Sequence, residues 1–438
     1  MSSPSPEFLD SIAPVLGCYY AVAAVLNVAA SLRSWRARHR WRPVVWLALG
    51  AGFAAGAAAA FLGHPPRTPE ALKSAIDAAL GPVTLSLGTF AALIGLFLGR
   101  RFFVLPPVAW TAWNAAVLFL GASMTDENFA AIVLKPDNVP IVAMVFLLGF
   151  FAWLGAAQAV NNDRRLAKGD PPAESALAKP VLVWPDLVYI ELICMLLLCA
   201  GLVVWSLALP APLEQPANPA VTPNPSKAPW YFLGFQEMLV FSDPAMAGVV
   251  LPALIILGLA AVPYLDPNRK GSGYYTIAER PVAYAVFMFG FLQLWILLIL
   301  IGTFLRGPNW TFFGLYEPRD PHRVMALHNV KLSEYFWATL LNRGVPQTPA
   351  ASGAIVRLGC VVWREVAGMA AVVLYFLVLP WALGRWKLKP IRGGMGRARY
   401  YLMTFLLLMM LALPLKMLLH WTLHLSYIVS MPEYSLNF

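Results

Sequence analysis

Residues 222–237 read TPNPSKAPWYFLGFQE and lie between two apolar runs, at 187–209 and 246–265. Prolines both precede this stretch and stand inside it: Pro210, Pro212, Pro216, Pro219, Pro223, Pro225 and Pro229. Because proline fixes its own φ and restricts the residue before it, the chain should leave the first run extended. Trp230, Leu233 and Glu237 then recur at helical spacing, which predicts a short amphipathic helix on a membrane surface.

The composition around this stretch is that of a polytopic membrane protein. Of 438 residues, 59% are hydrophobic and only 12% are charged, which is unlike a soluble domain. The apolar runs have the length of membrane-spanning helices. We therefore predict an all-α polytopic integral membrane protein with ten spans and an extended outer-face segment. The spans are predicted at about 12–32, 44–63, 82–99, 107–123, 139–160, 187–209, 246–265, 281–305, 363–384 and 399–425.

The net charge of +10 comes largely from basic residues in the short loops between the predicted spans. About twenty of the 32 Lys and Arg residues fall in alternate short loops, at 33–43, 100–106, 161–186, 266–280 and 385–398. The positive-inside rule makes these loops cytoplasmic and places both termini on the outer (periplasmic) side of a bacterial inner membrane. The basic balance thus indicates no nucleic-acid partner. The first residues carry no basic region, so we expect the first apolar run to stay as a span and not to be cleaved as a signal peptide.

Four motifs within about residues 180–320 resemble the C-terminal half of cytochrome b, called subunit IV where it is a separate chain. They are WPDLVY at 184–189, APWYF at 228–232, PYLDP at 263–267 and RP at 280–281. In that family a Pro-Glu-Trp-Tyr motif lies in the loop where quinol is oxidised. In this chain Pro229 stands where the family has its glutamate, which leaves the proton acceptor open.

The resemblance implies a quinone site on the outer loop. Quinone or quinol, the substrate, would contact the residues of the motif and the lysine before it: Lys227, Pro229, Trp230, Tyr231 and Phe232. Catalytic roles would fall to Tyr231, as a hydrogen-bond donor to a quinone carbonyl, and to Glu237, as the substitute proton acceptor. The alternative is structural, with Lys227 a phosphate anchor and Glu237 a solvated residue on an interfacial helix.

A second, cytoplasmic-side quinone site is a weaker implication of the resemblance. Glu191 lies about one turn inside the sixth span, and Asp186 lies beside it. Ionisable residues inside spans mark function or pairing, and carboxylates here could supply protons for quinone reduction. The alternative is that Glu191 pairs with an arginine of the loop.

The histidines and cysteines indicate no metal bound by this chain alone. Of the six histidines, His39, His64, His322, His328, His420 and His424, only the last two share a predicted helix. A four-helix cage of paired histidines cannot be built from them, so haem b is expected on a partner chain. Ligation of a haem or metal by His420 and His424 together with a partner is the less favoured alternative. The four cysteines, Cys18, Cys194, Cys199 and Cys360, form no haem-attachment or zinc motif.

Three regions follow from these patterns. Residues 1–160 form five spans of unknown family, 161–320 the three-span region similar to subunit IV, and 321–438 an outer segment plus two spans. The long segment at 307–350 is expected to fold against a partner.

The function predicted from the resemblance is that of a non-haem membrane subunit of a quinol–cytochrome c oxidoreductase-like complex in a respiratory chain. Its partners would be a haem b-binding subunit similar to the N-terminal half of cytochrome b, a Rieske-type iron–sulfur protein, a c-type cytochrome and membrane lipid. Two alternatives stay open: a structural scaffold of an electron-transfer assembly with an inactive quinone site and, less favoured, a transporter.

Overall fold

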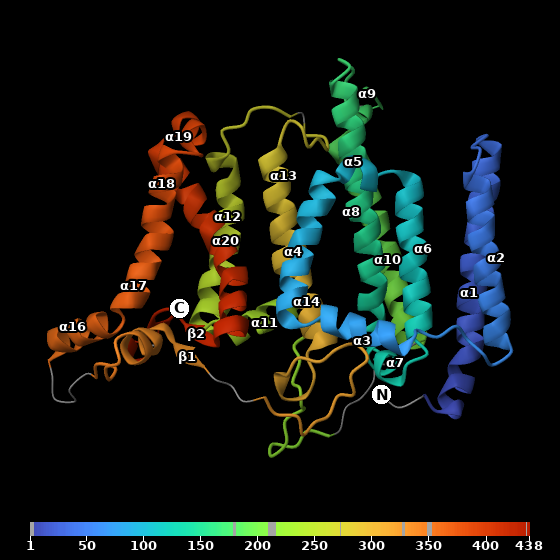
Figure 1. Cartoon of the computed structure of the whole chain (residues 1–438). Coiled ribbons are helices and arrows are strands. Elements are labelled where there is room, and N and C mark those ends of the chain that lie inside the picture. The colour runs from blue at the N-terminus through green and yellow to red at the C-terminus, as the bar shows by residue number, and fades with distance from the viewer. Residues whose placement is uncertain are drawn as a thin grey trace. The chain divides into compact units, whose positions relative to one another are not determined.

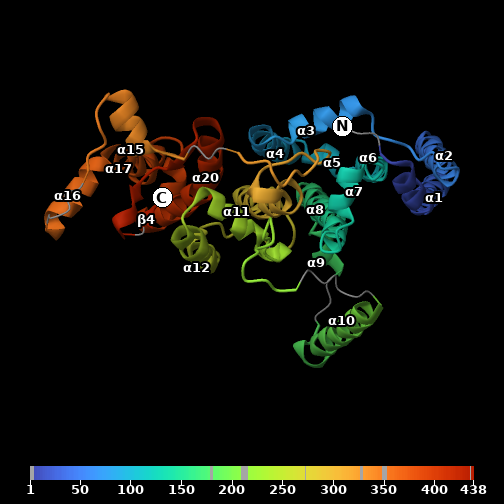
Figure 2. The same cartoon turned by 90° about the horizontal axis from the view of Figure 1, so that it is seen from below.

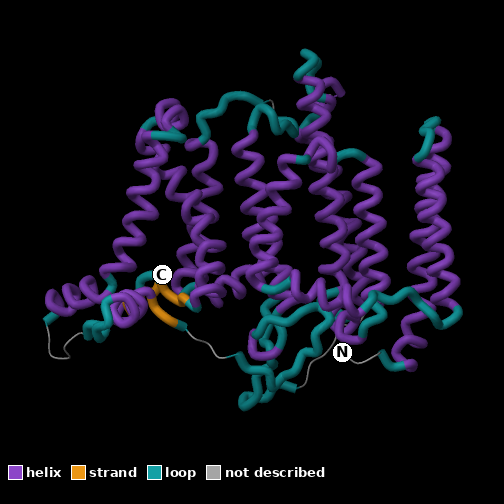
Figure 3. The backbone as a smooth tube through the Cα atoms, in the orientation of Figure 1, coloured by secondary structure: helices purple, strands orange, loops and turns teal. Residues whose placement is uncertain are grey.

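Most of the described chain is helical, as the sequence predicts (Figures 1 and 3). The computed structural model describes residues 4–177, 181–208, 216–271, 273–325, 329–347, 353–434 and 436–438. Pro210, Pro212 and His328 lie outside the described residues. The described part contains four short strands, in two two-stranded sheets.

The first of two compact units takes in the chain up to Leu72, Leu98–Pro223 and Gly271–Pro281. Its elements are α1 (Pro6–Arg36), α2 (Arg42–Phe61), α5 (Arg100–Phe103), α6 (Pro106–Ser123), α7 (Glu127–Val133), α8 (Val139–Leu166), α9 (Ala173–Leu177), η1 (Val183–Leu187) and α10 (Val188–Ala208).

The second unit takes in Lys73–Phe97, Asn224–Lys270 and Val282–Phe438. Its first elements are α3 (Glu70–Ala79), which the division crosses near its start, α4 (Pro82–Leu98), η2 (Trp230–Phe232), α11 (Leu233–Phe241), η3 (Met246–Val250), α12 (Leu251–Leu265), α13 (Pro281–Met288), η4 (Phe289–Ile296), α14 (Leu297–Leu300), η5 (Ile301–Leu305) and η6 (Pro308–Trp310). They are followed by β1 (Val330–Lys331), α15 (Leu332–Glu334), η7 (Tyr335–Leu340), α16 (Ala354–Arg364), α17 (Val366–Val373), η8 (Leu374–Val378), α18 (Leu379–Arg385), α19 (Lys389–Met395), α20 (Arg397–Leu423), β2 (Leu425–Tyr427), β3 (Ser430–Met431), η9 (Pro432–Tyr434) and β4 (Leu436–Asn437). Each unit combines segments from more than one of the three regions predicted from the sequence. The division into three regions therefore stays a prediction.

Eight described helices are long and apolar enough to cross a membrane. The number rises to ten if each of two bent helix pairs counts as one span: α3 with α4, bent by 82°, and α6 with α7, bent by 114°. The ten predicted spans agree with this upper number. Proline opens several of these helices, at the first or second position of α1, α2, α6 and α8, where its missing N–H costs no helical hydrogen bond.

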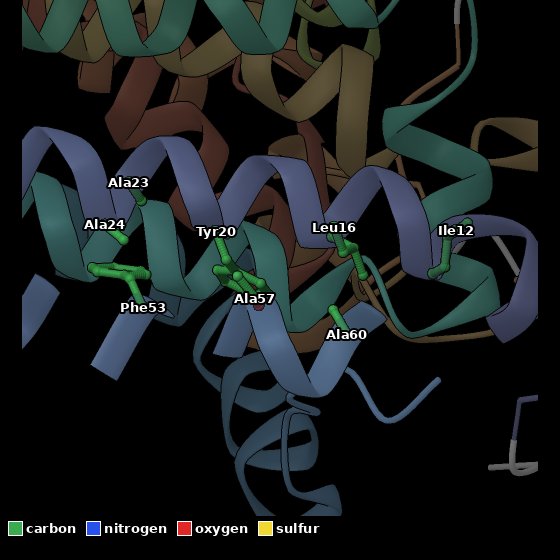
Figure 4. Close-up of a cluster of buried hydrophobic side chains, with 8 residues drawn as sticks. All are labelled: Ile12, Leu16, Tyr20, Ala23, Ala24, Phe53, Ala57 and Ala60. Atoms are coloured by element: carbon green, nitrogen blue, oxygen red, sulfur yellow. The ribbon is translucent and has the colours of Figure 1, made fainter. Parts of the chain in front are cut away.

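In the first unit α1 and α2 pack along their length through small residues. Ala57 and Ala60 of α2 let the helix approach Leu16 and Tyr20 of α1, and Phe53 fills the space beside Ala24 (Figure 4). A buried polar link then joins α1 to α6, since Asn27 Nδ2 donates to Asn114 Oδ1 at 2.6 Å.

In the second unit the short helix α11 lies across the direction of the long helices α12 and α20, which Figure 2 shows end-on. Its apolar face packs in a buried cluster with the end of the α13–η5 span and with α20. The cluster contains Met238, Phe241, Leu298, Ile301 and Met417. The helix predicted to begin at Trp230 is therefore present, as the turn η2 followed by α11.

Candidate functional site

The outer loop and α11 form one structure, because the loop ends in a turn that continues into the helix. Pro229 is extended and caps η2, which needs no N–H from the proline. Leu233, Glu237 and Phe241 follow at intervals of four and are all buried, so they share one face of α11. The carboxylate of Glu237 thus enters an apolar core and does not face solvent.

Glu237 forms a buried ion pair with Arg306, the first residue after η5. Arg306 Nη2 donates to Glu237 Oε1 at 2.5 Å and Arg306 Nε donates to Oε2 at 3.0 Å. The Glu237 side chain is 0% exposed. Burial raises the pKa of the Glu237 carboxyl, and the adjacent Arg306 charge limits the rise. The two-point geometry is that of a carboxylate accepting from a guanidinium, which fixes α11 against the end of the span.

Two further cations close the end of that span. The last carbonyls of a helix have no partner within it and attract positive charge. Lys227 Nζ donates to Thr303 O at 2.9 Å. Arg319 donates through Nη1 to Arg306 O at 2.9 Å, and through Nη2 to Phe304 O. Lys227, predicted to contact quinone or a headgroup, is thus placed as a cap that holds the loop against the span.

Side-chain amides fix the rest of the loop. Gln236 Oε1 accepts from Ala228 N and its Nε2 donates to Ser226 O, both at 2.8 Å. Asn224 and Asn309 form a second clip, in which Asn309 N donates to Asn224 Oδ1 at 2.6 Å. The backbone on either side of Lys227 is therefore held at several points.

A row of aromatic side chains stays exposed beside this fixed backbone. Trp230, Tyr231 and Phe232 are 40%, 47% and 51% exposed. Their ring centroids are 5.6 Å and 4.8 Å apart in sequence order, and the row continues through Phe235 to Trp295 of η4, 5.0 Å away. The Tyr231 hydroxyl makes no hydrogen bond within the described residues, and the side chain is about half-exposed.

The predicted second site has a different character. Asp186 on η1 and Glu191 on α10 are both exposed. Neither forms a hydrogen bond or ion pair with the residues that the structure describes. The structure does not complete a site around them, and their role in quinone reduction stays a prediction.

Two residues of the outer-loop site, Arg306 and Gln236, were not predicted from the sequence. Arg306 carried a signal, because a cation at the end of a span is a natural partner for a glutamate on an otherwise apolar helix face. Gln236 carried none, since its two bonds depend on how the loop turns back.

Helix α20 carries His420 but not His424. His420 lies in the last turn of α20, edge-to-face with Phe241 at 5.5 Å. The helix ends at Leu423, and His424 follows as a left-handed cap with φ 54°. The prediction that the two histidines share a helix was therefore wrong, because the helix ends one residue before His424. No group of three or more His, Cys, Asp or Glu side chains that could hold a metal occurs among the described residues.

The first part of the 307–350 segment, which follows the α13–η5 span, packs on α3 of the same unit. Tyr316 N donates to Asp77 Oδ1 at 3.2 Å, and the Lys73 ammonium lies 5.8 Å from the Tyr316 ring centroid. These contacts attach it to α3. Docking of the rest of the 307–350 segment on a partner stays a prediction.

Taken together, the structure defines a polytopic α-helical membrane protein in which a clamped loop presents aromatic rings at the end of a span. Residues 216–316, which include this loop and span, match the family described as Cytochrome b(C-terminal)/b6/petD. The chain thus contains a domain of the cytochrome b C-terminal, subunit IV-like kind, as the motifs within 216–316 predict, and the WPDLVY motif at 184–189 lies before the matched residues. This family indicates a membrane subunit of a cytochrome bc-type complex. No solved structure matches the chain.

Proposed function

We propose that this chain is the non-haem membrane subunit of a quinol–cytochrome c oxidoreductase-like complex and that residues 229–232 form one wall of its outer quinol pocket. The observation that carries the proposal is that the family match covers a loop whose backbone is clamped while its aromatic rings stay exposed. A rigid backbone with exposed rings suits a planar, apolar ligand.

In this proposal quinol binds against Trp230 and Phe232, and Tyr231 donates a hydrogen bond to its oxygen. Oxidation removes two electrons and two protons from the quinol. The electrons pass to a Rieske-type iron–sulfur protein and to haem b of a partner subunit, and a c-type cytochrome accepts from the former. Haem b is assigned to the partner subunit in this proposal, so no step uses a haem held by this chain. The protons leave on the outer side of a bacterial inner membrane, where both termini are proposed to lie.

Glu237 is the proposed proton acceptor, reached through water. Two nearby groups support such a path, because Thr303 Oγ1 and Arg319 Nε are buried without a partner among the described residues. Buried polar atoms of this kind are usually satisfied by water. Uptake of a proton by Glu237 requires the Arg306 pair to open, so the two residues are proposed to act together.

The test is steady-state quinol–cytochrome c reductase activity of the purified complex. Tyr231→Phe is expected to lower kcat/KM about tenfold, the value of one hydrogen bond to the substrate. Tyr264→Phe, at another exposed tyrosine of the same unit, is the matched control and should leave activity unchanged. Intrinsic b haem in the isolated chain would contradict the assignment of haem to a partner.

A scaffold with an inactive quinone site is the second candidate, favoured by one observation. Pro229 replaces the family's glutamate, and the substitute Glu237 is fully buried against Arg306. Unchanged turnover in both Tyr231→Phe and Glu237→Gln would favour the scaffold over the pocket.

A further inference from the structure

A groove lies between α1 and α6 of the first unit, outside the region that matches cytochrome b. Its volume is about 420 Å³, and its walls are almost wholly apolar. Val15, Val22 and Leu26 line it on α1, and Trp110, Trp113 and Val117 line it on α6.

The polar groups along the groove are already used by the protein. Asn27 Oδ1 accepts from Trp110 Nε1 at 3.0 Å, and Asn114 Nδ2 donates to Trp110 O at 2.8 Å. The Tyr19 hydroxyl donates to Val117 O at 2.8 Å. The polar side chains of the lining thus have partners within the protein, so the groove suits a hydrocarbon chain better than a polar quinone head.

The groove runs along the middle of the α1 span. The lining residues of α1 run from Val15 to Asn27, about 18 Å along a helix at 1.5 Å per residue. Half of a hydrocarbon core of about 30 Å is about 15 Å. The predicted span at 12–32 has its middle near Val22, so an acyl chain that descends one leaflet from the C-terminal end of that span fills the part of the groove between Asn27 and Val22.

The same face of α1 carries positive charge just beyond the groove. Arg33 follows Leu26 by seven residues, two helical turns, and therefore lies on the lining face. Arg36 ends the helix one turn later, and both arginines are exposed. Because the apolar run of α1 ends at these arginines, they lie at the depth of lipid headgroups.

The second wall brings its own arginines to the same end. The bonds from Tyr19 to Val117 and from Asn27 to Asn114 show that α1 and α6 run antiparallel. The start of α6 thus lies beside the end of α1. The preceding helix α5 carries Arg100 and Arg101.

We infer that the α1–α6 groove binds one anionic phospholipid, with an acyl chain in the groove and its phosphate on Arg33 and Arg36. Charge complementarity selects this occupant, because basic residues at the end of a groove between spans attract anionic headgroups. The inference does not depend on the quinol pocket.

Native mass spectrometry of the full chain, purified from membranes in mild detergent with its bound subunits, tests this site. Phosphatidylglycerol is the added probe, and phosphatidylcholine is its zwitterionic counterpart. Removing two arginine contacts in Arg33→Gln/Arg36→Gln is expected to weaken phosphatidylglycerol binding about 30-fold. Arg269→Gln/Arg399→Gln, two exposed arginines elsewhere, is the charge-matched control and should bind like the wild type.

A second variant tests the groove itself. Val22→Trp fills the groove from an exposed position and should remove the bound lipid without disturbing the core. Unchanged phosphatidylglycerol binding in both variants would overturn the inference. So would equal binding of phosphatidylcholine, or a quinone as the retained molecule.

Discussion

The two candidate carboxylate sites differ in how far the protein encloses the carboxylates. Glu237 is enclosed by its own chain, with Arg306 as its ion-pair partner and η5 behind it. Asp186 and Glu191 are exposed on helices that bury no residue. A membrane helix with no buried face has lipid or protein around it, so the residues described around Asp186 and Glu191 do not enclose a site there.

The largest change in stability is expected when the ion pair between Glu237 and Arg306 is broken. Arg306→Ala leaves the buried Glu237 carboxylate unpaired and should lower the free energy of unfolding by about 3–5 kcal/mol. Thermal and denaturant unfolding in detergent micelles measures this. Arg323→Ala, which removes the half-exposed pair with Glu317, is the matched control and should cost about 1 kcal/mol or less. Equal losses in the two variants would show that the Glu237 environment is not special.

A smaller effect is expected at the clip that holds the loop. Gln236→Ala removes two hydrogen bonds to backbone and should cost about 1–2 kcal/mol. Hydrogen exchange of residues 226–232 should become faster. Gln347→Ala is the control, since Gln347 is exposed and bonds to none of the described residues. If exchange of the loop stays at the wild-type rate, Gln236 does not clamp it.

The C-terminal tail offers an intermediate case between the enclosed and the exposed carboxylates. Arg364 Nη1 donates to Glu433 Oε1 at 2.7 Å, and this bond lowers the pKa of the Glu433 carboxyl. Its stabilisation is therefore complete above the ordinary glutamate pKa of about 4.3 and is lost as the pH falls through the lower folded value.

Hydrogen exchange around Ser430 should accordingly show loosening of the tail only in acid, by under about 1 kcal/mol. Glu433→Gln should remove this pH dependence. Persistence of the acid loosening in Glu433→Gln would assign it to another group.

The smallest effect is expected at the exposed pair. Asp186→Asn and Glu191→Gln should each change the stability of the isolated chain by less than about 0.5 kcal/mol, because neither carboxylate has a partner among the described residues. The same variants measured in the assembled complex would show whether a partner covers them. A fall in the free energy of unfolding of more than about 1 kcal/mol in the isolated chain would show that these carboxylates do have a partner within it.

Hydropathy predicted the membrane-spanning part closely. The spans expected at 246–265 and 281–305 have these same bounds in the structure, because apolar length alone determines them. The pairing of Glu237 with Arg306 was not predicted, since the two residues are 69 positions apart and no local pattern links them. The end of α20 at Leu423 was also missed, because a left-handed cap at a histidine leaves no mark in an apolar run.

In the proposed pocket the aromatic side chains of Trp230, Tyr231 and Phe232 contact quinol. Photolabelling of the complex in membranes with an azido-substituted quinone, followed by peptide mapping, tests this contact most directly. We expect labelling between Trp230 and Phe235 that excess quinol prevents. Labelling confined to other segments, with this loop unmodified, would contradict it.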